Sequence, residues 1–96
     1  MEQKKSGVEL IQIERQKQID KYGYTPEHDS MYSGSQLKFA ALSYLNTAIY
    51  GKSVGEEDWP FDKVYFKPGT EIACLSKAGA LIAAEIDRLT QEENDE

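Results

Sequence analysis

The sequence has little that would suit secretion, a membrane span or a long nucleic acid. Cys74 is the only cysteine, so no disulfide can form within the chain and a cytoplasmic location is expected. The longest nearly apolar run, Ala78–Ala84, is far shorter than the roughly 18 residues of a membrane span. Met1–Gly7 is polar and does not have the apolar stretch of a signal peptide. Lys and Arg number 11 against 17 Asp and Glu, and the resulting net charge of −6 disfavours binding to a long phosphate backbone.

The length and composition indicate one small globular domain. The 96 residues leave no room for a second domain, and 40% hydrophobic with 29% charged residues is typical of a folded chain. We expect a single domain over residues 1–96, with an ordered core at about 6–90 and a frayed acidic tail at 91–96. Because a chain of this size has a thin core, self-association is an effective way to enlarge it. The glycine-rich phosphate loops of P-loop and Rossmann proteins are absent from the sequence.

Three segments carry the start and stop signals of helices. Ser6 and Glu9 fit a capping box before the first helix, and Ser33 and Gln36 fit a second one. Gly51 is placed to end the second helix. The expected helices cover about residues 6–22, 33–50 and 70–89.

A long connection, Lys52–Gly69, separates the second and third expected helices. A connection of this length in a small domain is usually functional or disordered, but its aromatic content argues against disorder. Lys63–Lys67 is expected to be extended. The aromatic rings either cover the open end of the helix bundle or line a ligand site; they belong to Trp59, Phe61, Tyr65 and Phe66.

The third expected helix is apolar nearly all round. Its main stripe consists of Ile72, Leu75, Gly79, Ile82, Ile86 and Leu89, and a face of small residues beside it consists of Ala73, Ser76, Ala80 and Ala83. Only a narrow strip near Lys77 and Arg88 is expected to face solvent. Two other helices can cover about half of such a helix, so we expect the small-residue face to meet another subunit. The prediction is an all-α, three-helix bundle with a long aromatic-rich loop between helices two and three, forming a homodimer or homotetramer through helix three.

Several polar side chains fall on helical faces that otherwise point to the core. Arg15 lies in the middle of the apolar stripe of the first helix, with Gln18 beside it and Glu14 at its margin. Glu85 and Asp87 lie on opposite flanks of the third helix. Since buried charges are costly unless they are paired or bound to a metal, these residues need partners.

Two interpretations of these polar residues are open. In the first, Arg15 forms a structural ion pair with Glu85 or Glu71, and Gln36 is only a cap. In the second, one pocket forms from Glu14, Arg15, Gln18, Gln36 and Glu85 together with the turn Glu27, His28 and Asp29. Carboxylates and an imidazole in such a pocket suit Mg²⁺ bridging to a phosphate. The spacing matches no zinc pattern, and Cys74 on a buried face is disfavoured as a nucleophile.

Four stretches together resemble a family of short phage and prophage proteins. The family has an E-R-x-x-Q helix, a G-W/Y-T-P-E-H-D turn, a W-P-W segment and a K-A-G-A-L-I-x-A-E-I-x-R-L helix. The corresponding stretches here are Glu14–Gln18, Gly23–Asp29, Trp59–Phe61 and Lys77–Leu89. The likeness covers most of residues 7–89. More distantly, the family is similar to the dATP/dGTP diphosphohydrolases and MazG-like all-α nucleoside triphosphate pyrophosphatases.

This resemblance implies a Mg²⁺-dependent nucleoside triphosphate pyrophosphohydrolase. The resemblance points to Glu14, Asp29 and Glu85 as metal ligands, Glu27 and His28 to orient the attacking water, and Arg15 and Lys77 as phosphate contacts. Gln18 and Gln36 of the polar pocket are further candidates to bind the substrate. Relatives tend to have acidic or histidine residues in place of Ser30, Tyr32 and Gln36, which leaves fewer ligands here. The alternative is a non-catalytic accessory protein of a phage or mobile element that binds a nucleotide or another partner through the same pocket.

Overall fold

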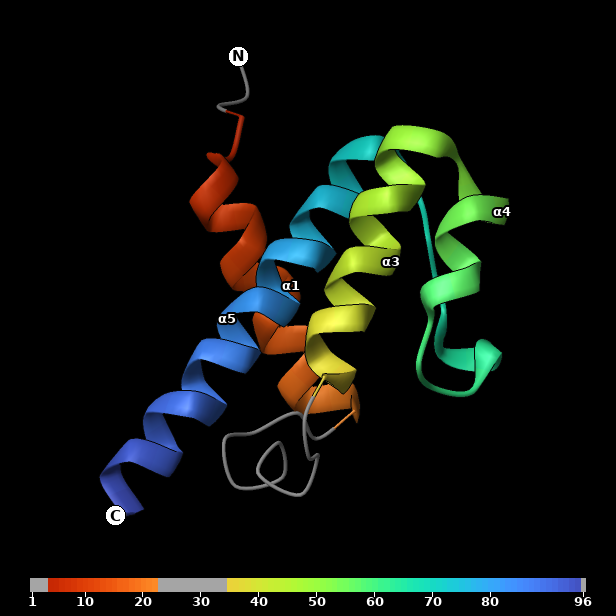
Figure 1. Ribbon diagram of the computed structural model, residues 1–96. Coiled ribbons are helices and arrows are strands. Elements are labelled where there is room, and N and C mark those ends of the chain that lie inside the picture. The colour runs from red at the N-terminus through yellow and green to blue at the C-terminus, as the bar shows by residue number, and fades with distance from the viewer. Residues whose placement is uncertain (1–3, 23–34, 96) are drawn as a thin grey trace.

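The computed structural model describes residues 4–22 and 35–95, which fold into helices joined by short connections (Figure 1). The elements are α1 (Gly7–Tyr22), α3 (Gln36–Tyr50), α4 (Lys52–Gly55), the 3₁₀ turns η1 (Glu56–Asp58) and η2 (Lys63–Tyr65), and α5 (Glu71–Asp95). These two ranges contain no strand, so the all-α prediction is confirmed for them. Within the same ranges, no helix combines the length and the apolar character that a membrane span requires.

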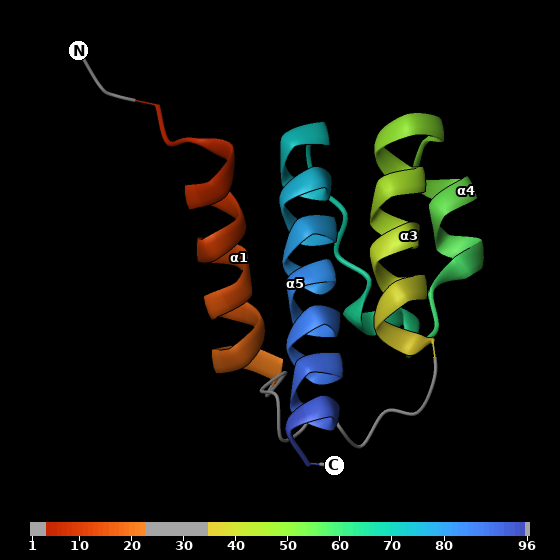
Figure 2. The same cartoon turned by 60° about the vertical axis from the view of Figure 1, so that its left-hand side comes forward.

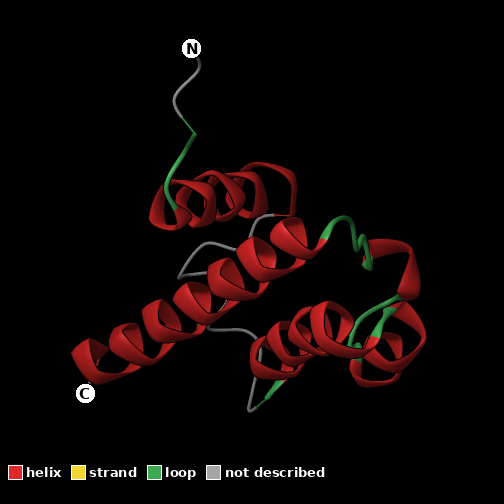
Figure 3. Ribbon diagram, turned by 90° about the horizontal axis from the view of Figure 1, so that it is seen from above, coloured by secondary structure: helices red, strands yellow, loops and turns green. Residues whose placement is uncertain are grey.

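Helix α5 occupies the centre of the fold. It packs against α3 on one side and α1 on the other, and α4 packs on the far side of α3 (Figures 2 and 3). α1 and α5 run in the same direction, whereas α3 runs in the opposite one (Figures 1 and 2). The four α-helices of the described residues therefore pack side by side in a row, one helix more than in the expected three-helix bundle.

The helix ends show which capping signals the chain uses. The Ser6 hydroxyl accepts a hydrogen bond from the Glu9 N–H at 3.1 Å and the Glu9 carboxylate accepts one from the Ser6 N–H at 3.2 Å, which confirms the first capping box. Gly51 ends α3 with φ of +104°, a conformation that favours glycine, and its N–H donates to the Thr47 carbonyl. Ser33, the expected cap of the second helix, lies outside the described residues. α5 begins directly after Thr70, as expected.

Helix α5 continues to Asp95, past the end at about residue 89 that the sequence predicts. Acidic residues near a helix C-terminus cost only about 0.3 to 1 kcal/mol each. Each further residue of an established helix adds a backbone hydrogen bond without a new nucleation step. The electrostatic penalty is therefore too small to end the helix.

The connection between Tyr50 and Glu71 is helical in part, not one irregular loop. α4 lies so close to α3 that a Cβ atom on Gly55 would be 1.9 Å from the Thr47 hydroxyl and 2.4 Å from the Ser43 carbonyl oxygen. The expected extended piece at 63–67 instead contains η2, because the Asp62 side chain and carbonyl accept hydrogen bonds from the N–H groups of the following residues. Local hydrogen bonds at Asp62 thus override the strand propensity of its neighbours.

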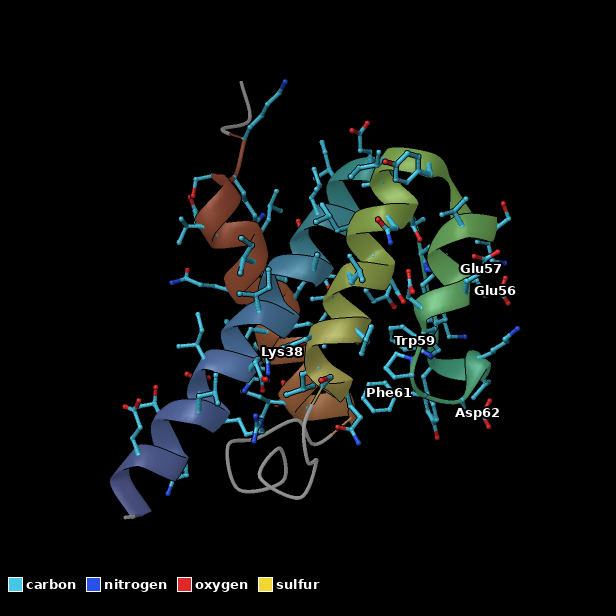
Figure 4. All side chains as sticks on the ribbon, in the orientation of Figure 1. Lys38, Glu56, Glu57, Trp59, Phe61 and Asp62 are labelled. Atoms are coloured by element: carbon cyan, nitrogen blue, oxygen red, sulfur yellow. The ribbon has the colours of Figure 1, made fainter. Side chains whose placement is uncertain are left out.

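The aromatic residues of this connection pack against α3. The Trp59 ring lies 5.1 Å from that of Phe66 and 5.6 Å from that of Phe61, and Tyr44 of α3 contacts both Trp59 and Phe66 at 5.3 Å between ring centroids. Trp59 and Phe61 both point toward α3 (Figure 4). Tyr65 is the exception, because half of its surface is exposed. The packing of the other three aromatic residues of the connection fits the interpretation in which the rings cover the helix bundle.

The faces of α5 are used in the opposite way from that expected. The small residues Ser76 and Ala80 are buried within the chain. Gly79 lets α1 approach closely, since a Cβ atom there would lie 2.7 Å from the side chain of Ile11. At Ser76 and Ala80 the chain itself covers the small-residue face, which leaves less of that face for another subunit, and the oligomer stays a prediction.

The larger apolar residues of α5 are the ones left exposed. Together with neighbouring residues of α3 they form what we call the apolar face, which consists of Ile72, Leu75, Ile82, Ile86 and Leu89 of α5 and Leu42, Leu45 and Ile49 of α3. Their exposed fractions range from 38% to 65%. Arg88, expected in an outward strip, is instead 5% exposed, because its guanidinium has a buried partner on the same helix.

Candidate functional site

Glu85 is a buried carboxylate that α5 places against two cations. The Lys38 ammonium of α3 lies 2.5 Å from Oε2 of Glu85, and Nε of Arg88 donates to Oε1 at 2.6 Å. A second Arg88 nitrogen donates to Oε2 at 3.3 Å. Arg88 reaches Glu85 because residues three apart are neighbours on a helix. We call Lys38, Glu85 and Arg88 the Glu85 triad.

The Glu85 triad keeps this carboxyl ionised. Burial raises the pKa of Glu85, but the hydrogen bonds and positive charges of Arg88 and Lys38 lower it by more, so the pKa lies below its ordinary value of 4.5. Both carboxylate oxygens already have cationic partners. In this arrangement Glu85 organises Lys38 and Arg88 and does not offer a carboxylate edge to a metal.

A second ion pair links α1 to α5. The Arg15 guanidinium lies 3.4 Å from the Asp87 carboxylate. In one of the two interpretations Arg15 pairs with Glu85 or Glu71. Asp87 takes their place in the structure because it lies on the flank of α5 that faces α1, whereas Glu85 faces α3. α5 itself therefore separates the Arg15–Asp87 pair from the contact between Lys38 and Glu85.

Two glutamines add buried polar atoms to the same end of the fold. Gln18 of α1 is 6% exposed and Gln36 opens α3. The side-chain carbonyl oxygens of both residues are buried and accept no hydrogen bond within the described part of the chain. Glu14, one turn before Gln18, is largely buried and lies 3.6 Å from the Lys17 ammonium. Buried amide oxygens without a partner favour a bound water, ligand or protein group nearby.

The end of α1 and the beginning of α3 lie at the same end of the fold (Figures 1 and 2). These residues come from the second half of α1, the first turn of α3 and the part of α5 that pairs with them. We call them the polar end of the molecule, which consists of Arg15, Gln18, Gln36, Lys38, Glu85, Asp87 and Arg88. Its charges lie on two flanks of α5, with Arg15 and Asp87 on one and the Glu85 triad on the other. In the Glu85 triad two cations face one carboxylate, in a chain whose net charge is −6. Such a local positive excess beside an amide group can bind a phosphate-bearing anion.

Other predicted site residues do not join the polar end or cannot be placed there. Glu27, His28 and Asp29 lie outside the described residues. Lys77 lies two turns along α5 from Glu85, roughly 12 Å away. Its ammonium donates to the Lys67 carbonyl and lies 5.6 Å from the Tyr44 ring centroid, so it belongs to the aromatic cluster.

Lys38 and the buried role of Arg88 are the features that the sequence interpretation missed. The three-residue spacing of Glu85 and Arg88 was a usable signal, because such pairs meet on a helix surface. Lys38 is 47 residues away from Glu85 in the sequence, and only the packing of α3 on α5 brings the two together.

Comparison of the chain with protein-family models, with curated proteins and with solved structures finds no match.

Proposed function

We propose that this protein is a Mg²⁺-dependent nucleoside triphosphate pyrophosphohydrolase of the all-α class. The observation that supports this proposal is the polar end, where three helices contribute cations and buried amides in an otherwise acidic chain. The resemblance to phage proteins and all-α pyrophosphatases supplies the reaction class. The substrate class is a phosphate-bearing nucleotide.

The contacts of the described residues support roles that differ in part from those implied by the resemblance. In the proposal, Arg15 and Lys38 contact phosphate oxygens, and Arg88 holds Glu85 so that the carboxylate positions Lys38. Glu85 does not fit the role of a metal ligand, because Lys38 and Arg88 engage both of its oxygens. Glu14 fits that role better, since its carboxylate pairs with Lys17, a more exposed residue of the same helix, at 3.6 Å.

Glu14 would hold the metal together with Asp29, and Glu27 or His28 would orient the water. A bound Mg²⁺ would neutralise phosphate charge and make water more acidic. The Arg15 guanidinium would add positive charge where negative charge develops on the phosphates.

The test is a screen of the canonical ribo- and deoxynucleoside triphosphates with Mg²⁺ or Mn²⁺. Pyrophosphate release and the rise in melting temperature are measured on the same samples, so binding and turnover are read separately. We expect turnover by the wild type, its loss in Glu14→Gln, and a weaker ligand-induced melting shift in Arg15→Met. Lys63→Met is the matched control, because Lys63 pairs with Glu56 on the surface of η1 and η2, away from the polar end.

A non-catalytic binding protein of a phage or mobile element is the second candidate. The engagement of both Glu85 oxygens by cations favours it, because this carboxylate then acts as a structural element. This candidate predicts a nucleotide-induced rise in melting temperature without pyrophosphate release. Glu85→Gln does not discriminate between the two candidates, since it also removes the centre of a buried ion network.

A further inference from the structure

The apolar face is too extensive for a small monomer. Ile72, Ile82 and Ile86 expose 65%, 51% and 57% of their surface in one line along α5. Eight large apolar side chains, with exposed fractions of 38% to 65%, lie together on this face. A contiguous apolar patch of this kind is typical of a protein–protein contact, whereas single exposed apolar residues are normal on a monomer.

The shape of the apolar face is complementary to itself. The exposed side chains of α5 form a ridge with a hollow on each flank. The hollow between α3 and α5 has a volume of about 360 Å³ and is lined by residues such as Leu42, Leu45 and Ile82. The hollow between α1 and α5 has a volume of about 280 Å³ and includes Leu10, Ile72 and Leu75. A two-fold axis would let the ridge of each copy enter a hollow of the other.

The charges on this face also suit a second copy. Lys38 and Glu85 are the two charged residues that line the hollow between α3 and α5, and they neutralise each other. Two identical faces can therefore meet without a net charge of one sign at their centre, although each chain carries −6 overall. A strongly basic partner would find little to pair with on this face.

We propose that two copies of this protein form a dimer through the apolar face, with their α5 helices crossing near Ile82. Glu71 and Glu93 flank the ridge, eleven residues before and after Ile82. Fully aligned antiparallel α5 helices would bring these acids of opposite copies together. A crossing of about 50°, the commonest helix-packing geometry, keeps them apart. This inference does not depend on the proposed nucleotide chemistry.

The first test is sedimentation velocity of the full chain from about 1 to 100 μM, the range in which transient dimers dissociate. We expect the wild type to be dimeric, with a dissociation constant in or below this range. Ile82→Glu should raise the dissociation constant of the dimer by about 100-fold or more, because dimer formation would then bury two glutamate charges, one from each copy. Val64→Glu is the matched control, since Val64 is 59% exposed on η2, outside the apolar face.

Two further measurements make the test independent of folding defects. Circular dichroism must show wild-type helix content for both variants, and an Ile82→Cys variant should form a disulfide-linked dimer under mild oxidation while Val64→Cys does not. Cys74 is buried, so it does not interfere. The dimer should also tighten with added salt, which screens the repulsion between two chains of charge −6.

A wild-type chain that stays monomeric at 100 μM, a concentration at which even weak specific dimers form, would overturn the proposal. So would a dimer that Ile82→Glu leaves intact. A dimer without nucleotide hydrolysis would leave the proposal standing and count only against the proposed enzyme function.

Discussion

Lys38 and Glu85 join α3 to α5 through an ion pair of 2.5 Å, and Arg88 shares the same carboxylate. Glu85 and Arg88 are both buried, whereas about half of the Lys38 side chain is exposed. Removal of Arg88 and removal of Lys38 should therefore destabilise the protein by different amounts. This difference can be measured through the free energy of unfolding.

We expect Arg88→Met to destabilise the protein by about 3 to 5 kcal/mol, because it leaves a buried carboxylate with one partner fewer. Lys38→Met should cost less, since water can reach the Lys38 site. Denaturant titration gives both values. The double variant Glu85→Leu/Arg88→Met is the control: removing both charges should restore most of the loss, and a double variant as unstable as Arg88→Met would contradict the ion-pair explanation.

The Glu85 triad also predicts a pH dependence. Because the pKa of Glu85 is lower in the folded state than its ordinary value of 4.5, the ionised carboxylate stabilises the fold above that pH. This stabilisation should be lost as the pH falls below 4.5 and passes through the lowered pKa of Glu85 in the folded protein. The measurement is the free energy of unfolding at stepped pH for the wild type and Glu85→Gln. If both proteins lose stability equally over that range, Glu85 is not responsible.

Gly55 tests the close contact between α4 and α3. Gly55→Ala should destabilise the protein by about 3 kcal/mol, because the new methyl group would overlap Thr47 and the Ser43 carbonyl. Gly7→Ala is the matched control, since nothing lies within 4 Å of the added atom and alanine favours a helix. Thermal unfolding compares the two. Equal melting temperatures would show that α4 does not pack as closely as described.

Tyr44 tests the anchoring of the aromatic connection to α3. Its hydroxyl accepts a hydrogen bond from the Lys67 N–H at 3.0 Å. Tyr44→Phe keeps the ring contacts but removes this acceptor, so we expect a loss of about 1 kcal/mol. Tyr50→Phe, at a tyrosine that is 67% exposed, should have little effect. A comparable loss in both variants would mean that the hydrogen bond to Lys67 is not the cause.

Features that depend on neighbouring residues could be predicted from the sequence. The capping box of Ser6 and Glu9 involves residues three apart, and the positive φ of Gly51 follows from its place after the last helical residue. The aromatic packing of Trp59 and Phe66 was also foreseeable, because exposed rings in a long connection are costly.

Features that depend on which helix covers which face could not be predicted. Helical periodicity shows that α5 is apolar on most sides. It does not determine whether the side with Ala80 or the side with Ile82 packs against α1. The close approach of Ile11 to Gly79 decides this. The pairing of Lys38 with Glu85 is likewise a product of tertiary packing, and the candidate residues at 27–29 lie outside the described part of the chain.

The central place of α5 has a consequence for how the protein opens. α1 packs on α5 but makes no comparably extensive contact with α3 or α4 in the described residues. α1 can therefore detach as a separate cooperative unit while α3, α4 and α5 stay folded. Amide protons of α1 would then exchange with solvent deuterium sooner than those of Leu81 and Ala84, which lie in the core between α3 and α5.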